Sequence, residues 1–99
     1  MRNHKQYRPK VLDLFQSFLA EKITTEELLT TLTAIERNLK NGVISTQKGL
    51  WFKFFKGDTG ATTVREIRSD LYSTVNSSYI KERMQLAIEN SKELQIYYS

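Results

Sequence analysis

Cysteine is absent from this 99-residue sequence, which excludes disulfide bonds, thiolate metal sites, iron–sulfur clusters and cysteine nucleophiles. Its apolar runs are only a few residues long, whereas about 20 apolar residues are needed to cross a bilayer. No apolar signal segment follows the charged N-terminus. The length suits one domain with a single modest core. We therefore expect a cytoplasmic protein that forms one domain over residues 1–99.

Acidic residues are scarce at the start of the chain, where the net charge of +4 is concentrated. Four basic residues precede the first acid, Asp13, and they equal the whole excess: Arg2, Lys5, Arg8 and Lys10. Such a segment can attract nucleic acid, an anionic membrane surface or an acidic protein. Chain ends are usually poorly ordered, so we expect residues 1–8 to form a flexible basic arm.

Acids are also missing between Glu36 and Asp58, and this stretch holds the densest aromatic segment of the chain. The only tryptophan and three of the five phenylalanines lie within residues 51–55. Large aromatic side chains are most simply explained as part of a core. If Trp51 or Phe52 is exposed among the neighbouring lysines, the same segment becomes an anchor for a partner.

Two helices are predicted from apolar residues at three- and four-residue spacing. The first begins at Pro9, since proline is well accommodated in the first turn of a helix, and it runs to about Glu21. The second begins at Thr24, which with Glu27 has the spacing of a capping box, and stops at Asn41-Gly42.

Further helices are predicted in the second half of the chain. A short third helix would run from Ser45 or Thr46 to Lys56, although Gly49 weakens it and leaves a strand or an irregular segment as alternatives. A helix capped by Thr63 should carry an apolar stripe through Val75. The pattern resumes at 79–88, as a second helix or a kinked continuation, with Ser78 as a candidate cap.

Four to five helices joined by short loops predict an all-α protein, an antiparallel four-helix bundle. The last residues, 94–99, alternate crudely and end in two tyrosines before Ser99. They could be a fraying helix end, a tail packed on the bundle or a docking segment.

Groups suited to catalysis are sparse. The only histidine, His4, lies in the basic arm, where it would be poorly positioned for proton transfer or metal binding. Residues 57–62 resemble a phosphate loop only superficially, because they lack its lysine and flanking strand. We expect a protein that is not an enzyme and has no catalytic residues, no cofactor, no metal site and no small-molecule substrate.

Nucleic acid is one candidate partner. Arg65 and Arg68, three residues apart on a predicted helix, could join the lysines of 48–56 and the N-terminal arm in a phosphate-binding face. Glu66 and Asp70 lie on the same predicted helix, and their negative charges make it unfavourable as a recognition helix for DNA. The chain could thus be a small basic regulatory protein of the phage or plasmid type.

A family resemblance points to a different partner. Residues 32–42, Leu-Thr-Ala-Ile-Glu-Arg-Asn-Leu-Lys-Asn-Gly, followed by Gln47-Lys48-Gly49-Leu50, resemble the middle of immunity proteins that protect lactic acid bacteria and streptococci from class II bacteriocins of the enterocin A and pediocin type. The resemblance implies a four-helix bundle that acts without catalysis at the inner membrane face, on the permease that the bacteriocin occupies. Peripheral contact with the membrane surface would accompany this role.

The resemblance also implies a partner-binding surface in the C-terminal half of the chain. Carried onto this sequence, its candidate residues are Lys48, Trp51, Phe52, Lys53, Lys56, Arg65, Arg68, Tyr97 and Tyr98. The dense aromatic run and the short tail depart from the family pattern.

A second resemblance leads to another kind of immunity protein. Residues 18–24, followed by Glu26-Glu27-Leu28, are similar to the opening of colicin D type immunity proteins, which cover the active site of a tRNA-cleaving toxin. Inhibitors of a basic nuclease are generally acidic, and a net charge of +4 has the wrong sign for that task.

Overall fold

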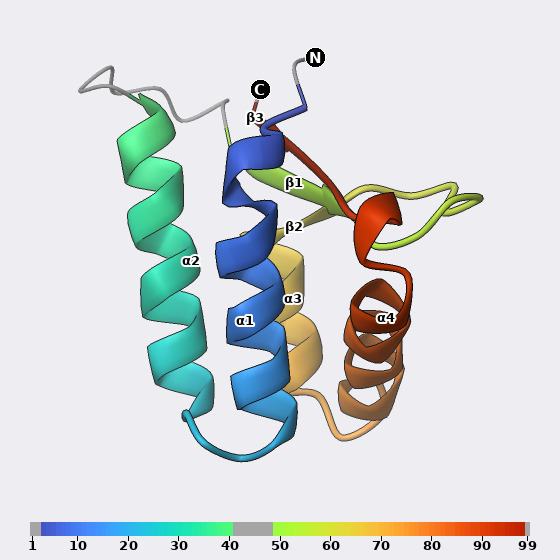
Figure 1. The fold of residues 1–99 in the computed structure, drawn as a ribbon. Helices are drawn as coiled ribbons and strands as arrows, with labels where there is room; N and C mark the ends of the chain where they lie inside the picture. The colour runs from blue at the N-terminus through green and yellow to red at the C-terminus, as the bar shows by residue number, and fades with distance from the viewer. Residues whose placement is uncertain (1–2, 41–48, 99) are drawn as a thin grey trace.

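Helices and a small antiparallel sheet together form the fold in the computed structural model, which describes residues 3–40 and 49–98. The helices are α1 (Arg8–Leu19), α2 (Thr25–Lys40), α3 (Val64–Leu71) and α4 (Ser77–Glu89), and the strands are β1 (Leu50–Lys53), β2 (Thr62–Thr63) and β3 (Gln95–Tyr98). Two short 3-10 helices, η1 (Lys5–Tyr7) and η2 (Ser91–Glu93), precede α1 and β3. The helices all lie on one side of the sheet (Figure 1).

The sheet overturns the predicted all-α four-helix bundle. Its strand order is β2-β1-β3, and both pairings of the central strand β1 are antiparallel. Phe52 lies opposite Thr62 on one side and opposite Ile96 on the other. The fold is therefore a mixed α and β fold, and the description as a helical bundle was wrong.

Residues 50–53 form a strand where a short helix was predicted. Leu50, Phe52 and Phe54 are buried, whereas Trp51 and Lys53 are half-buried. This is a period of two, which a strand produces because successive side chains point to opposite faces. Aromatic residues fit a pleated surface well, and Gly49 disfavours a helix, so the segment pairs with β2 and β3 instead. The N-terminal part of the predicted helix lies outside the described residues.

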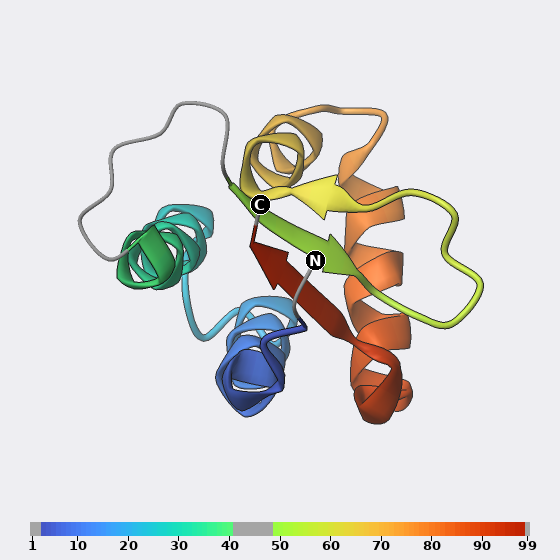
Figure 2. The ribbon, with the colours of Figure 1, turned by 90° about the horizontal axis from the view of Figure 1, so that it is seen from above.

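The C-terminal tail becomes an edge of the sheet. Its crude alternation marks the strand β3, in which Ile96 is buried opposite Phe52. The described start of the chain continues this edge: Asn3 forms an isolated bridge with Tyr97, and the His4 amide donates to the Ile96 carbonyl at 2.7 Å. Residues near both termini thus lie side by side (Figure 2).

The first two predicted helices are confirmed as α1 and α2, and the predicted stop of the second at Asn41-Gly42 lies outside the described residues. The apolar face of α1 buries Val11, Leu14, Phe15 and Phe18. At the start of α2 the capping box is formed in both directions. The Glu27 amide donates to Thr24 Oγ1 at 3.1 Å, and the Thr24 amide donates to Glu27 Oε1 at 3.3 Å.

The next helical segment is divided into two helices. Thr63 Oγ1 accepts from the Glu66 amide at 3.1 Å and caps α3, as predicted, but α3 ends at Leu71. Val75 was assigned to its apolar stripe and is instead 81% exposed, because it lies in the connection before α4. Ser78 lies inside α4, whose N-cap is Asn76.

The core lies between the sheet and the helices. Three phenylalanine rings from α1 and the end of β1 meet there, with centroids 5.8 to 6.2 Å apart: Phe15, Phe52 and Phe54. The Leu50 amide donates to Glu36 Oε2 at 2.9 Å and ties β1 to α2. No helix among the described residues is long and apolar enough to cross a membrane.

Candidate functional site

The face of the sheet turned away from the helices is the best candidate site. We call it the outer face, and it carries the strand side chains that alternate with the buried ones: Trp51, Lys53, Thr63, Gln95 and Tyr97. The helices lie beneath the sheet, so they do not cover this face (Figures 1 and 2).

Strand register brings two aromatic residues together on the outer face. Trp51 lies directly opposite Tyr97, and Lys53 lies opposite Gln95. Side chains at directly opposed positions have Cβ atoms about 4.5–5.5 Å apart. The Tyr97 hydroxyl donates to Gln95 Oε1 at 2.6 Å, which holds the tyrosine ring along the strand. All four of these side chains are partly exposed.

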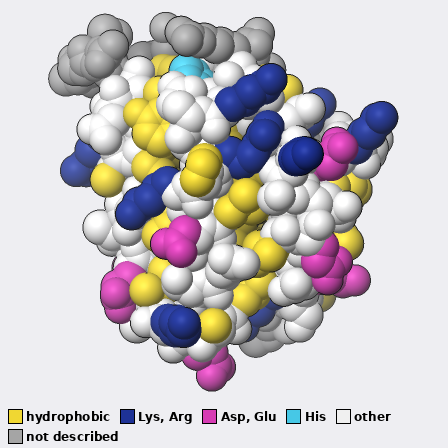
Figure 3. Space-filling model, in the orientation of Figure 1, with side chains coloured by type: hydrophobic (Ala, Val, Ile, Leu, Met, Phe, Trp, Pro, Cys, Tyr) yellow, Lys and Arg dark blue, Asp and Glu magenta, His cyan; other side chains and the backbone are white. Residues whose placement is uncertain are grey.

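Basic residues lie on the outer face and at the same end of the molecule. Strands β1, β2 and β3 contain no aspartate or glutamate, and Lys53 projects from the face itself. Exposed lysines nearby in the fold are Lys5, before α1, and Lys10, in its first turn. Figure 3 shows Lys and Arg side chains gathered at the sheet end of the molecule, while most Asp and Glu side chains in that view lie toward the other end.

Several predicted contact residues lie away from the outer face. Phe52 is fully buried in the core, so its proposed role as an exposed contact is wrong. Lys56 is exposed in the loop between β1 and β2, and Arg65 and Arg68 are exposed on α3. Lys48 lies outside the described residues.

The two terminal tyrosines point to opposite faces of β3. Tyr98 lies opposite the buried Leu50 and so faces the helix side, whereas Tyr97 faces outward. Desolvation, together with the negative charge of Glu36, raises the pKa of the Tyr98 hydroxyl above its usual value. Only Tyr97 belongs to the outer face.

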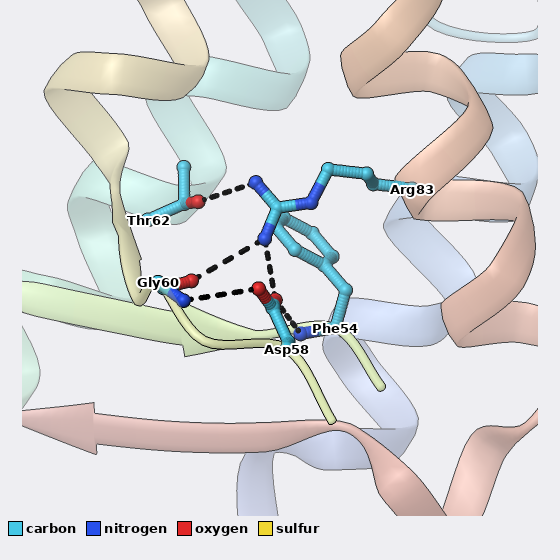
Figure 4. A network of polar contacts seen from close by, with 5 residues as sticks. All are labelled: Phe54, Asp58, Gly60, Thr62 and Arg83. Carbon is cyan, nitrogen blue, oxygen red and sulfur yellow. Dashed lines mark hydrogen bonds and ion pairs between the residues drawn. The ribbon is translucent and has the colours of Figure 1, made fainter. Parts of the chain in front are cut away.

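A buried arginine network supports the same region from the helix side. Arg83 of α4 donates from Nη1 to Thr62 Oγ1 at 2.8 Å and from Nη2 to the Gly60 carbonyl at 3.3 Å, and it forms an ion pair with Asp58 (Figure 4). Its guanidinium carbon lies 4.7 Å from the centroid of the Phe54 ring. The arginine thus binds α4 to the loop that joins β1 to β2.

Asp58 is the acceptor that organises this loop. Its Oδ2 accepts from the Phe54 amide at 3.1 Å, and its Oδ1 accepts from the Gly60 amide at 3.3 Å. Gly57 takes a positive φ of 92°, a conformation that glycine adopts without steric cost. The segment expected to be a simple connecting turn is a loop organised by the Asp58 carboxylate. The network that includes Arg83 stabilises the fold.

Sequence reasoning missed four residues of the region. Gln95 and Thr63 join the outer face through strand pairing, which a single segment does not reveal. The alternation of 94–98 was the available signal for Gln95. Arg83 and Asp58 are 25 residues apart and meet only in the folded chain, and no local pattern marks a buried ion pair.

The described residues offer little for catalysis. No group of three or more His, Asp or Glu side chains in this part of the chain could hold a metal ion. The imidazole of His4 lies near the terminus, with Nδ1 3.5 Å from Gln6 Nε2. A hollow between α1 and α4 is lined by mixed polar and apolar side chains, among them Asp13, Ser17, Lys22 and Gln85. The outer face, with its aromatic pair and Lys53, remains the most distinctive surface of the described residues.

No protein-family model, curated protein or solved structure matches this chain. The resemblance to class II bacteriocin immunity proteins implied a four-helix bundle, and the sheet contradicts that fold. The fold that the resemblance implied is thus corrected, while the immunity role itself stays a prediction.

Proposed function

We propose that this protein binds nucleic acid without catalysing a reaction, and that the outer face of the sheet is its binding surface. The observation that carries the proposal is the pairing of Trp51 with Tyr97 on a face that none of the described helices covers and whose strands bear no acid (Figures 1 and 2). Aromatic side chains stack on bases, and lysines neutralise phosphates.

The charge distribution supports this function more than the net charge alone. Lys53 lies on the outer face, and Lys5 and Lys10 are exposed at the same end of the molecule. Several acids lie on α2 and α4, among them Glu26, Glu27 and Glu82. The exposed lysines at the sheet end favour the approach of a polyanion to that end.

The test is binding of a mixed set of labelled 20-nucleotide oligomers, single-stranded and duplex, measured by fluorescence anisotropy at rising salt. We expect binding at low salt that weakens linearly on a logarithmic scale, since each neutralised phosphate releases counterions. Lack of binding to every oligomer at low salt would refute the proposal.

Two single-lysine variants distinguish a local surface from overall charge. Lys53→Gln removes a cation from the outer face, and Lys81→Gln removes one from α4, where its Nζ lies 5.8 Å from the Phe18 ring centroid. Both lower the net charge equally. We expect Lys53→Gln to weaken binding and to reduce the salt slope by up to about 1, with Lys81→Gln close to the unmodified protein.

A further inference from the structure

We infer that the nucleic acid bound by the outer face is a single strand whose bases stack on Trp51 and Tyr97. This inference rests on the proposed function and names its substrate class. The faces of bases are hidden inside a duplex, so an aromatic pair on the face of a sheet stacks on bases that are unpaired.

The polar groups around the aromatic pair can contact the bases and phosphates of a single-stranded nucleic acid. Gln95 Oε1 is occupied by the Tyr97 hydroxyl, which leaves the Gln95 amide NH₂ as a donor to a base edge. Thr63 Oγ1 accepts from the Glu66 amide, so its own hydroxyl hydrogen remains available. Lys53, two residues beyond Trp51 on the same face, is the phosphate contact.

The helices offer no comparable surface for duplex DNA. In Figures 1 and 2 α4 lies across the direction of α3, and residues 72–76 connect them, an arrangement related to a helix-turn-helix. Its second helix would have to present basic and amide side chains to the major groove. Arg83, the only arginine of α4, is just 8% exposed and is held by the loop network. The exposed Lys81 and Gln85 of this helix lie among the exposed acids Glu82 and Glu89. This helix pair is poorly suited to a phosphate-lined groove.

The experiment compares a 10-nucleotide single strand with a hairpin duplex, in DNA and RNA versions of each. Anisotropy gives affinity, and the fluorescence of Trp51, the only tryptophan, reports stacking directly. We expect the single strand to bind more tightly than the hairpin and to quench Trp51. The DNA and RNA versions distinguish which sugar is preferred.

Tyrosine variants supply matched controls. Tyr97→Leu removes an outer-face ring, whereas Tyr72→Leu removes a ring that is 58% exposed at the end of α3. Since the loss of the ring removes a stacking contact with a base, Tyr97→Leu should weaken single-strand binding by about tenfold. Tyr97→Phe keeps the ring and should stay within about threefold by the same reasoning, and Tyr72→Leu should have no effect. Circular dichroism and thermal unfolding verify that each variant is folded.

The outcomes separate the inference from the proposed function. Equal binding of hairpin and single strand, with no Trp51 quenching and no effect of Tyr97→Leu, would overturn the inference and leave nucleic-acid binding intact. Absence of binding to all oligomers would remove both. Displacement of the oligomer by polyglutamate with equal quenching, or self-association that hides Trp51, would overturn the inference in favour of an acidic protein or a second copy of this chain.

Discussion

At the scale of single residues, Arg83 is the side chain that makes the most contacts with the loop between β1 and β2. One guanidinium contacts the loop through Asp58, Gly60 and Thr62, and it lies over the ring of Phe54. Its Nε is buried without a hydrogen-bond partner, a cost that the other contacts offset. A buried charge is tolerated when it is paired in this way.

Removal of the Arg83 cation should therefore be costly. Arg83→Met leaves Asp58 buried without its partner, and we expect the free energy of unfolding to fall by about 3–5 kcal/mol. Urea unfolding followed by Trp51 fluorescence measures this. Asp58→Asn and the double variant complete a double-mutant cycle. A coupling energy near zero would show that the two side chains act independently.

At the scale of elements, the strand β1 shows how neighbours decide conformation. Residues 50–55 contain aromatic side chains that would also form one helical face, and the isolated segment does not distinguish the two arrangements. Pairing with β2 and β3 satisfies the backbone and buries alternate residues, Leu50 and Phe52. Helices α1 and α2, by contrast, carry periodicity and capping signals within their own residues.

The loss of stability on truncating side chains along β1 should alternate from one residue to the next. Phe52→Ala should cost about 3–5 kcal/mol of unfolding free energy, because it leaves a cavity among the rings of Phe15 and Phe54. Lys53→Ala should change it by no more than about 0.5 kcal/mol, as surface substitutions usually do. Phe52→Leu provides a milder variant if Phe52→Ala fails to fold. Equal losses at both positions would contradict the alternation.

At the scale of the whole molecule, the two ends of the chain are packed together. Arg8 Nε donates to the Leu94 carbonyl at 3.0 Å, and the Ile96 amide donates to Asn3 Oδ1 at 3.3 Å. With the bond from the His4 amide to the Ile96 carbonyl, these contacts cover the outer edge of β3. Residues 3–8 thus pack against β3, where a flexible arm was expected.

Deletion of residues 1–4 should consequently destabilise the entire domain. Two hydrogen bonds to Ile96 are lost, each contributing about 0.5–1.5 kcal/mol, so we expect a loss of about 1–3 kcal/mol. The uncovered edge should also increase aggregation. Deletion of residues 1–2 alone, which retains Asn3 and His4, is the matched control. Calorimetry and light scattering measure both effects, and identical behaviour of the two deletions would contradict the edge-covering role.

The helices could be predicted because their signals are local. Apolar spacing and the cap residues Thr24 and Thr63 lie within a few positions of the turns that they specify. The sheet could not be predicted in the same way, since β2 has two residues and β1 meets β3 across more than 40 positions of the chain. Pairing between such distant segments is a long-range interaction, so no pattern within either segment specifies it.

The candidate site was likewise partly predictable from the sequence and partly decided by the tertiary structure. The aromatic and basic composition of residues 50–56 predicted Trp51 and Lys53 as candidate contact residues, and Tyr97 was a candidate only through the family resemblance. Which side chains reach solvent was decided by strand register, which turns Trp51 and Tyr97 outward while it turns Phe52 and Tyr98 toward the helices. Composition is a property of the chain, whereas the side of a sheet on which a residue lies depends on partners elsewhere in the fold.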